Sequence, residues 1–267
     1  MFLKEKTPLK KENPVSVPPL PQKKKSDYEL IVFSHLRWDF VYQRPQHIIS
    51  RMAENRKTLF IEEPLGICEK SNSLFHMEKV SSKLDVLKPK VSSIYDIHKI
   101  LKLLPIDSSP MVWFYSPSFM ELLPFLNPSV VVYDCMDELS LFKGAPAIIK
   151  EQEQELMKRA NIIFTGGISL YESKSAKAAN VHCFPSSVDY CHFKKALSNL
   201  EIPEDMKNFK NPTIGYIGVI DERIDMHLLL KSAELLPQFE FVMIGPLAKI
   251  GEDDLAKREN IHYLGMK

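Results

Sequence analysis

Short apolar runs alternate with amphipathic segments along most of this chain. Six of these runs are rich in β-branched or aromatic residues and are bounded by polar residues. Continuous apolar runs of this length are typical of strands that are buried on both faces of a sheet. The pattern therefore predicts strands at residues 30–34, 58–62, 111–115, 130–134, 162–165 and 181–184.

Helices are predicted between these strands, several with recognisable start signals. Ser116 places a capping hydroxyl before Pro117, and Arg44 precedes Pro45 at the start of another amphipathic pattern. A third helix is expected over residues 147–160, with basic residues in its last turn, where they suit the helix dipole. Strands that alternate with helices predict an α/β fold with a mostly parallel, doubly wound sheet.

A second domain is predicted near the C-terminus, because the same alternation starts again after a charged, proline-flanked segment. We expect an N-terminal Rossmann-like domain over residues 27–200, a linker over residues 201–211 and a second domain over residues 212–267. The second domain would hold three strands and one or two helices, about half of a Rossmann-like domain. The sequence therefore reads as C-terminally truncated relative to the architecture that it begins. Its elements are expected at residues 213–219, 226–236, 240–244 and 261–264.

Charge is uneven along the chain, although the net charge of the 267 residues is only +1. Residues 1–26 hold seven Lys, two Glu and five Pro, a composition that predicts a disordered, basic, proline-rich tail. A solvated spacer is the favoured reading of this tail, with weak association with an anionic membrane surface as the alternative. Neither a signal-peptide core nor an apolar run of ~20 residues is present, so the predicted location is cytoplasmic or peripheral at the inner membrane face. The overall charge gives no support for a nucleic-acid partner.

Cofactor and metal motifs are missing from the sequence. It contains neither G-x-G-x-x-G nor G-x-x-x-x-G-K-[ST], which argues against dinucleotide and P-loop enzymes. The four cysteines lack a C-x-x-C pair and zinc-like spacing, so they are expected to be reduced and structural: Cys68, Cys135, Cys183 and Cys191. We therefore predict no metal site and no cofactor.

Candidate site residues gather where predicted strands end, which is where open α/β sheets bind ligands. The first cluster follows residues 30–34 and runs into a helix N-terminus, where free backbone N–H groups favour anions. Trp38 offers a face for stacking on a sugar. The alternative is a loop whose tryptophan fills the core and whose arginines pair with nearby acids. The other predicted substrate-binding residues of this cluster are hydrogen-bond donors: His35, Arg37, Arg44 and His47.

The second cluster places Asp134, Asp137 and Glu138 directly after an apolar strand. Three carboxylates in five residues could hold a metal, position sugar hydroxyls or act as a base. The spacing differs from the D-x-D of metal-dependent transferases. Asp137 and Glu138 are therefore the predicted catalytic residues, with an acidic cap on the following helix as the alternative.

Glycine and serine residues follow two further strands. Gly166 and Gly167 precede a helix that Ser169 is expected to cap, an arrangement that brings backbone close to a substrate. Ser186 follows the last strand of the first domain and is also a predicted substrate-binding residue. A plain strand-to-helix turn would produce the same glycine pattern.

The second domain has its own candidate group after its first two strands. Gly218 could admit a diphosphate, and Arg223 could neutralise a departing nucleotide. Asp221 and Gly245 complete the predicted donor-binding group.

Taken in order, six segments of the chain resemble a bacterial branch of the GT-B glycosyltransferases, the "glycosyl transferase group 1" type. They are IVFSHLRWDFVYQRPQHIISRMA, VVYDCMDELSLFKGAP, IIFTGGISLYESK, VHCFPSSVDYCHF, IGYIGVIDERID and FVMIGPLAKI, and they fall within residues 28–267. The P-S-S-V-D stretch is similar to the family's P-x-G-V-D element, with Ser187 in place of the usual glycine.

The resemblance implies two Rossmann-like domains that face each other across a cleft, with the acceptor on the first and the nucleotide-sugar on the second. It also implies retaining, metal-independent chemistry, with Arg223 in the loop where such enzymes place basic residues on the donor diphosphate. A Glu-x7-Glu segment that would bind the donor sugar and ribose has no counterpart in this sequence.

The leading hypothesis is a glycosyltransferase of cell-surface polysaccharide biosynthesis. It would move a hexose from a nucleoside-diphosphate sugar to a glycan or lipid-linked acceptor. The nucleotide-sugar would be a co-substrate, and no cofactor is expected. An alternative is a non-catalytic carbohydrate-binding or interaction module that a partner chain completes. A third hypothesis, a phosphohydrolase that uses Asp134 and Asp137, predicts magnesium dependence.

Overall fold

The computed structural model describes residues 27–66 and 73–267, and it divides between Ser187 and Val188 into two compact units. The predicted tail, residues 1–26, and Cys68 lie outside the described residues. The division comes earlier in the chain than the linker expected at residues 201–211. The short helices α5 (Tyr190–Phe193) and η3 (Lys194–Leu197) therefore belong to the second unit.

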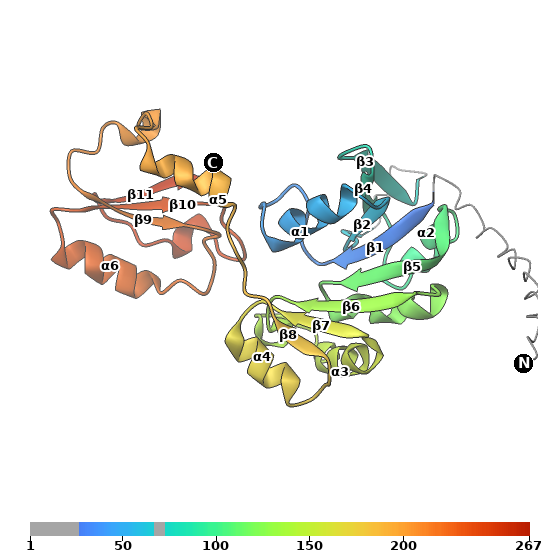
Figure 1. Ribbon diagram of the computed structural model, residues 1–267. Helices are drawn as coiled ribbons and strands as arrows, with labels where there is room; N and C mark the ends of the chain where they lie inside the picture. Colours follow the sequence, from blue (N-terminus) through green and yellow to red (C-terminus); the bar gives the residue numbers. More distant parts are fainter. Residues whose placement is uncertain (1–26, 67–72) are drawn as a thin grey trace, which may run out of the picture. The chain divides into compact units, whose positions relative to one another are not determined.

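The first unit contains an eight-stranded sheet in the order β3-β4-β2-β1-β5-β6-β7-β8 (Figure 1). All neighbouring strands are parallel except β3 and β4, which are antiparallel. The predicted α/β fold with a mostly parallel sheet is confirmed. The strands are β1 (Tyr28–Ser34), β2 (Thr58–Glu62), β3 (Phe75–Lys79), β4 (Leu84–Pro89), β5 (Ile106–Phe114), β6 (Val130–Cys135), β7 (Ile162–Thr165) and β8 (Val181–Cys183).

Helices cover both faces of this sheet because the strand residues alternate between two apolar clusters. Leu30 and Val32 of β1 pack with Ile49 of helix α1 (Arg44–Ala53) on one face. Ile31 and Phe33 point to the other face, which is covered by several helical segments. These are α2 (Ile97–Leu101), η1 (Pro117–Phe125), α3 (Ile149–Arg159) and, at the edge, α4 (Ile168–Ser175).

The winding direction of the sheet reverses between β1 and β5. The chain adds β2 and β4 on one side of β1, and then returns to add β5, β6, β7 and β8 on the other. At such a reversal the connections that leave the two central strands diverge, which opens a crevice beyond their carboxyl ends. The residues that follow Ser34 and Phe114 therefore lie at the position in this sheet that most favours ligand binding.

Two strands and one helix differ from the sequence-based expectation. Strand β3 is half-exposed and carries charged residues, and β4 follows it in a hairpin, so neither shows a continuous apolar run. The helix expected after Ser116 is a 3-10 helix with Pro124 inside it. A proline lacks the N–H that an α-helix requires at that position. Ser116 does cap it, by accepting a hydrogen bond from the backbone N–H of Ser118.

The second unit has a three-stranded parallel sheet in the order β11-β10-β9. Its strands are β9 (Thr213–Ile217), β10 (Glu240–Ile244) and β11 (Ile261–Gly265), and its main helix is α6 (Met226–Leu235). A small core forms around Phe241, Met243 and Ala233. The remaining 3-10 turns of the chain are η2 (Leu139–Leu141), η4 (Glu204–Met206) and η5 (Glu252–Asp254). Among the described residues, none of the helices has the length and apolar character needed to cross a membrane.

Candidate functional site

Most of the predicted substrate-binding residues leave the first sheet at one edge. Strands β1, β5, β6, β7 and β8 are mutually parallel, so the loops after them emerge on the same side of the sheet. His35 and Arg37 follow β1, Asp137 follows β6, and Gly166 and Gly167 follow β7. The fold therefore brings segments separated by more than a hundred residues to a common edge.

The loop after β1 is held by two buried polar side chains. Glu62, at the end of β2, accepts hydrogen bonds from Arg37 Nη1 at 2.8 Å and from the backbone N–H of Trp38 at 2.9 Å. The fully buried Gln46 donates from Nε2 to three carbonyl oxygens of the loop, those of Arg37, Trp38 and Val41. Because both polar groups are buried and satisfied, they fix the conformation of this loop.

Trp38 does not offer a face for sugar stacking, so this expectation is wrong. Its side chain is buried and packs edge-on against Phe60, with 5.0 Å between the ring centroids. It belongs to the apolar cluster beneath helix α1. The alternative reading from the sequence, a tryptophan that fills the core, is the one that the structure shows.

His35 lies at the reversal point of the sheet, directly after β1 and beside the end of β5. Burial lowers the pKa of His35 to about 4, and a hydrogen bond to the backbone of Tyr115 opposes this shift. The imidazole is therefore neutral at physiological pH. Its Nδ1 atom is buried and has no hydrogen-bond partner in the part of the chain that the structure describes. A buried polar atom without a partner is costly unless water or a ligand satisfies it.

Arg44 is engaged in a buried ion pair with Asp134. Its Nε and Nη2 atoms donate to the Asp134 carboxylate at 2.9–3.2 Å, and Nη1 donates to the carbonyl oxygen of Phe184 at 2.6 Å. Burial raises the pKa of Asp134, and the guanidinium opposes that shift. Arg44 thus links the start of α1 to the ends of β6 and β8, and the structure corrects its expected role as a free donor to substrate.

The carboxylates after β6 lie in different surroundings. Glu138 accepts from Lys174 Nζ at 2.8 Å, and Lys174 also donates to Glu153 at 2.7 Å. The Lys174 side chain is only 1% exposed. Burial alone would lower the pKa of Lys174, but its hydrogen bonds to both glutamates raise it. Glu138 is therefore held against α3 and α4, whereas Asp137 is half-buried in the loop after β6.

The glycine pair after β7 serves two purposes. A Cβ atom on Gly166 would lie 3.0 Å from the Met136 carbonyl oxygen, so a glycine lets the chain pass close to the segment after β6. Gly167 is the N-cap of α4 and has no atom within 4 Å of where a Cβ would be. The expectation that Ser169 caps this helix is wrong, because Ser169 is exposed in the first turn and the N-cap has no side-chain hydrogen bond.

The two remaining candidates of the first unit are more peripheral. His47, in the first turn of α1, packs edge-on against Tyr42 with 4.6 Å between the ring centroids. Ser186 is exposed in the irregular segment that follows β8. Both follow the carboxyl ends of strands, although no contact joins them to His35 or Arg37 in the structure as described.

In the second unit, Gly218 and Gly245 lie against each other after β9 and β10. A Cβ atom on Gly245 would be 1.8 Å from the carbonyl oxygen of Gly218, and Gly245 has a φ of +147°. Only glycine satisfies both conditions. The two loops therefore meet backbone to backbone at the carboxyl edge of this sheet. An anion-binding site needs such a place, where backbone N–H groups can come close to a bulky ligand.

Asp221 and Arg223 form a local ion pair beside this glycine contact. Arg223 Nε lies 3.0 Å from both Asp221 oxygens and Nη2 lies 2.6 Å from Oδ2, so the pKa of Asp221 is lowered by Arg223. The Arg223 side chain is nevertheless 60% exposed. The Asp221 side chain is only 10% exposed, so the pair holds the guanidinium in place while one side of it still faces solvent.

Known proteins share this architecture. No protein-family model matches the chain. The curated protein named "Putative teichuronic acid biosynthesis glycosyltransferase TuaH", from Bacillus subtilis (strain 168), is 23% identical over 212 residues, which are 72% of this chain and 49% of that protein. The chain thus spans about half the length of this curated relative.

Solved structures match over a larger share of the chain. Trehalose-6-phosphate synthase from E. coli bound with UDP-2-fluoro glucose aligns with a TM-score of 0.58 and 10% identity, over 89% of this chain and 73% of that one. Anabaena Alr3699/HepE in complex with UDP-glucose aligns with a TM-score of 0.52 and 10% identity, over 90% of this chain and 69% of that one. This chain has a GT-B fold.

Three buried polar residues that the sequence analysis did not identify hold the loops of the candidate site in place. Glu62, Gln46 and Lys174 each bind several partners from buried positions. Glu62 could have been found as the first of two carboxylates that end an apolar strand. Lys174 gave no such signal, because the short helix that carries it has no clear apolar face to mark a buried position.

The GT-B chain shows no arrangement of three His, Cys, Asp or Glu that could hold a metal ion among residues 27–66 and 73–267. Asp134, the last carboxylate within β6, is paired with Arg44. The candidate site therefore offers hydrogen-bond donors, the neutral imidazole of His35, backbone amides and the half-buried carboxylate of Asp137.

Proposed function

We propose that this chain carries the machinery of a glycosyltransferase that moves a hexose from a nucleoside-diphosphate sugar to a glycan or lipid-linked acceptor. The observation that carries the proposal is the backbone contact of Gly218 and Gly245 at a sheet edge, with the exposed Arg223 guanidinium nearby. Backbone amides and one arginine suit a diphosphate, whose oxygens accept hydrogen bonds and whose charge grows as the sugar departs. The names of the similar proteins, two of which were solved with UDP-sugars, favour the same ligand class.

The first unit would bind the acceptor. A neutral His35 with an unsatisfied Nδ1 can hydrogen-bond a sugar hydroxyl at the reversal point of the sheet. With a pKa of about 4 it is a weak base, so we assign it a positioning role. Asp137 remains the proposed catalytic carboxylate, because it lies half-buried in the loop at the carboxyl end of β6. Glu138 is instead bound to the buried ammonium of Lys174.

Two finer points belong to the same proposal. We expect retaining, metal-independent chemistry, since the proposed donor site relies on Arg223 and backbone amides for the charge of the diphosphate. We also expect the protein to work in the cytoplasm, on acceptors at the inner membrane face, in cell-surface polysaccharide synthesis. The curated relative's name, with its reference to teichuronic acid biosynthesis, supports that setting.

Isothermal titration of the full chain with UDP-glucose and other nucleoside-diphosphate sugars tests the proposal. Binding should weaken at least tenfold in Arg223→Gln. Lys231→Gln is a matched control, because Lys231 is similarly exposed and pairs with Glu234 at 2.7 Å. Failure of every nucleotide-sugar to bind would overturn the proposal. Binding without transfer to any acceptor would favour the alternative of a non-catalytic carbohydrate-binding module.

A further inference from the structure

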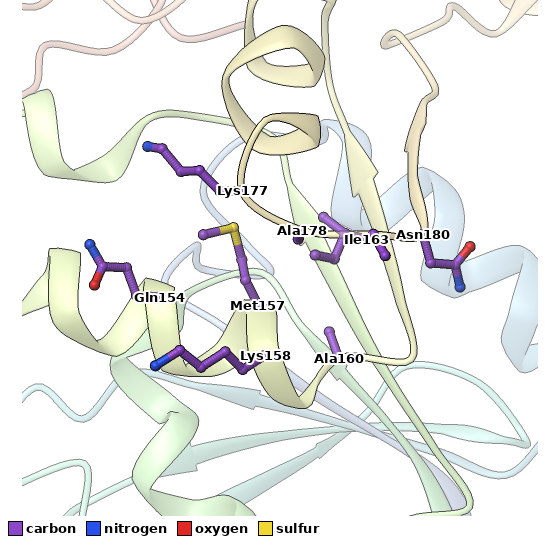
Figure 2. Close-up of a pocket in the computed structure, with 9 residues that line it drawn as sticks. Gln154, Met157, Lys158, Ala160, Ile163, Lys177, Ala178 and Asn180 are labelled. Atoms are coloured by element: carbon purple, nitrogen blue, oxygen red, sulfur yellow. The ribbon is translucent and has the colours of Figure 1, made fainter.

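A cavity of about 600 Å³ lies between α3 and the segment that follows α4, away from the candidate site (Figure 2). Ala160 lies just before β7 and Asn180 directly before β8, so this cavity is at the amino ends of these strands. The candidate site lies at their carboxyl ends. The residues that line the cavity are Gln154, Met157, Lys158, Ala160, Ile163, Lys177, Ala178, Ala179 and Asn180.

The cavity has an apolar side and a cationic side. In Figure 2 Ala160, Ile163 and Ala178 lie on one side of Met157, and the head groups of Lys158 and Lys177 extend on the other. Gln154 lies on the same side of Met157 as the two lysine head groups (Figure 2). None of the described residues that line the cavity is acidic. Its walls therefore combine two positive charges with an apolar surface.

The two lysines are available to a ligand. Lys158 is 73% exposed and lies 3.6 Å from Glu155, a carboxylate that Arg159 binds more closely at 2.7 Å. For Lys177, no ion pair is recorded within the described part of the chain. Asn180 is different, because its amide group donates to the Asn161 carbonyl and accepts from His182. The polar groups that remain to bind a ligand are those of Lys158, Lys177 and Gln154.

A neighbouring cavity of about 340 Å³ shares Gln154, Met157 and Lys177 with the larger cavity and extends along α3 towards Glu138 and Glu153. These two carboxylates both accept hydrogen bonds from Lys174, and Lys150 also lines the smaller cavity, so nearby ammonium groups offset their charge. The larger cavity has two lysines and no carboxylate in its lining, so an anionic group is favoured there.

We propose that the larger cavity binds an anionic amphiphile, with an apolar chain against Met157, Ile163 and Ala178 and a phosphate group between Lys158 and Lys177. The volume is that of ordinary small-molecule sites, which are mostly apolar with a few polar groups that fix orientation. Lysine binds phosphate as a point charge, and burial of the chain adds the hydrophobic contribution. The inference is independent of the proposed transferase activity.

Calorimetry of the full chain with hexyl phosphate, kept below its aggregation concentration, tests this inference. Hexyl phosphate should bind at least tenfold more tightly than inorganic phosphate or hexanol, because each of these supplies only half of the recognition. Each methylene added between butyl and hexyl phosphate should strengthen binding by up to about fourfold. Equal affinity for inorganic and hexyl phosphate would overturn the proposal.

Substitutions locate the binding. The Lys158→Gln/Lys177→Gln double variant should lose at least tenfold in affinity for hexyl phosphate. Gln154→Trp, which adds a bulky ring to the cavity lining, should lose a similar factor. Lys79→Gln, at an exposed lysine on β3, is the control and should bind like the wild type. Thermal unfolding of each variant verifies that the fold is intact. Wild-type affinity in a folded double variant would show that the phosphate binds elsewhere.

The amphiphile could be a membrane lipid or a soluble alkyl phosphate, and vesicles distinguish these sources. If the source is a lipid, the chain should sediment with vesicles that contain phosphatidic acid, and hexyl phosphate should release it. If hexyl phosphate binds and the vesicles do not, the ligand is a soluble molecule. Either result supports an anionic amphiphile as the ligand of the larger cavity. Vesicle binding that is unchanged in the double variant contradicts the proposal.

Discussion

Arg44 and Asp134 lie 90 positions apart in the sequence and form a buried ion pair, with Nη2 and Oδ1 separated by 2.9 Å. The pair joins the first helix to the strand on the far side of the sheet reversal. Without it, the loops at the carboxyl edge would lose a common anchor. The arrangement of the candidate site thus depends on the Arg44–Asp134 ion pair, whose own role is to stabilise the fold.

Arg44→Met should destabilise the first unit, because it leaves the Asp134 carboxylate buried without a counter-charge. Loss of one partner of a buried pair costs about 3–5 kcal/mol. Urea unfolding, followed by circular dichroism, measures this change. The double variant Arg44→Met/Asp134→Leu should recover much of the loss, since it removes the uncompensated charge. If the double variant were no more stable than Arg44→Met, the ion pair would not be the cause.

Lys174→Met should also destabilise the first unit, by about 3 kcal/mol, because Glu138 and Glu153 lose their shared ammonium. Thermal unfolding midpoints of wild type and variant give the measurement. Lys143→Met, at an exposed lysine, serves as the control. A midpoint for Lys174→Met no lower than that of the control would contradict a stabilising role for the shared ammonium.

The stability of the protein should fall as the pH drops from about 6.5 towards 4, in part through His35. Its folded-state pKa of about 4 lies below the usual value of 6.5, so in this window the unfolded chain takes up a proton that the folded chain does not. Above 6.5 both states are neutral and the contribution is constant. Between pH 6.5 and 4, the His35 contribution to the free energy of unfolding should fall by on the order of 2–3 kcal/mol.

The pH-dependent unfolding of His35→Gln isolates this contribution from that of the carboxylates. The variant should lose stability less steeply than the wild type between pH 6.5 and 4. Parallel curves for the two proteins would mean that His35 is not buried as a neutral ring.

Gly245→Ala should disrupt the second unit, because its Cβ would lie 1.8 Å from the Gly218 carbonyl oxygen and its φ is +147°. We expect a loss of about 2–4 kcal/mol from the clash and the backbone strain together. Hydrogen exchange of β9 and β10 reports on this unit alone. Gly215→Ala is the matched control, since a Cβ there meets nothing within 4 Å. Equal exchange in the two variants would contradict the proposed backbone contact.

Much of the fold could be predicted because buried parallel strands have an unambiguous pattern. Strands β2, β7 and β10 match the predicted ranges residue for residue. Strands β3 and β4 could not be found in this way. β3 is a partly exposed edge strand that carries charged residues, and the buried strand β4 is interrupted by Asp85 and Lys88, so neither has a continuous apolar run.

The candidate site was less predictable, because residue type does not reveal what a side chain contacts. Trp38 and Arg44 are residues that often bind sugars and phosphates, yet one fills the core and the other binds Asp134. Those outcomes depend on which strands become neighbours. Gly245 shows the reverse case, since a glycine after a strand is a strong signal for close backbone approach, and the structure has one.

Strand β9 is an edge strand with all five residues exposed, among them Ile214, Tyr216 and Ile217. One row of its backbone amides and carbonyls has no neighbouring strand in the described sheet, and such an edge can template pairing with any extended polypeptide. We therefore expect concentrated solutions of this chain to self-associate through the second unit. Dilute samples should stay monodisperse long enough for binding measurements.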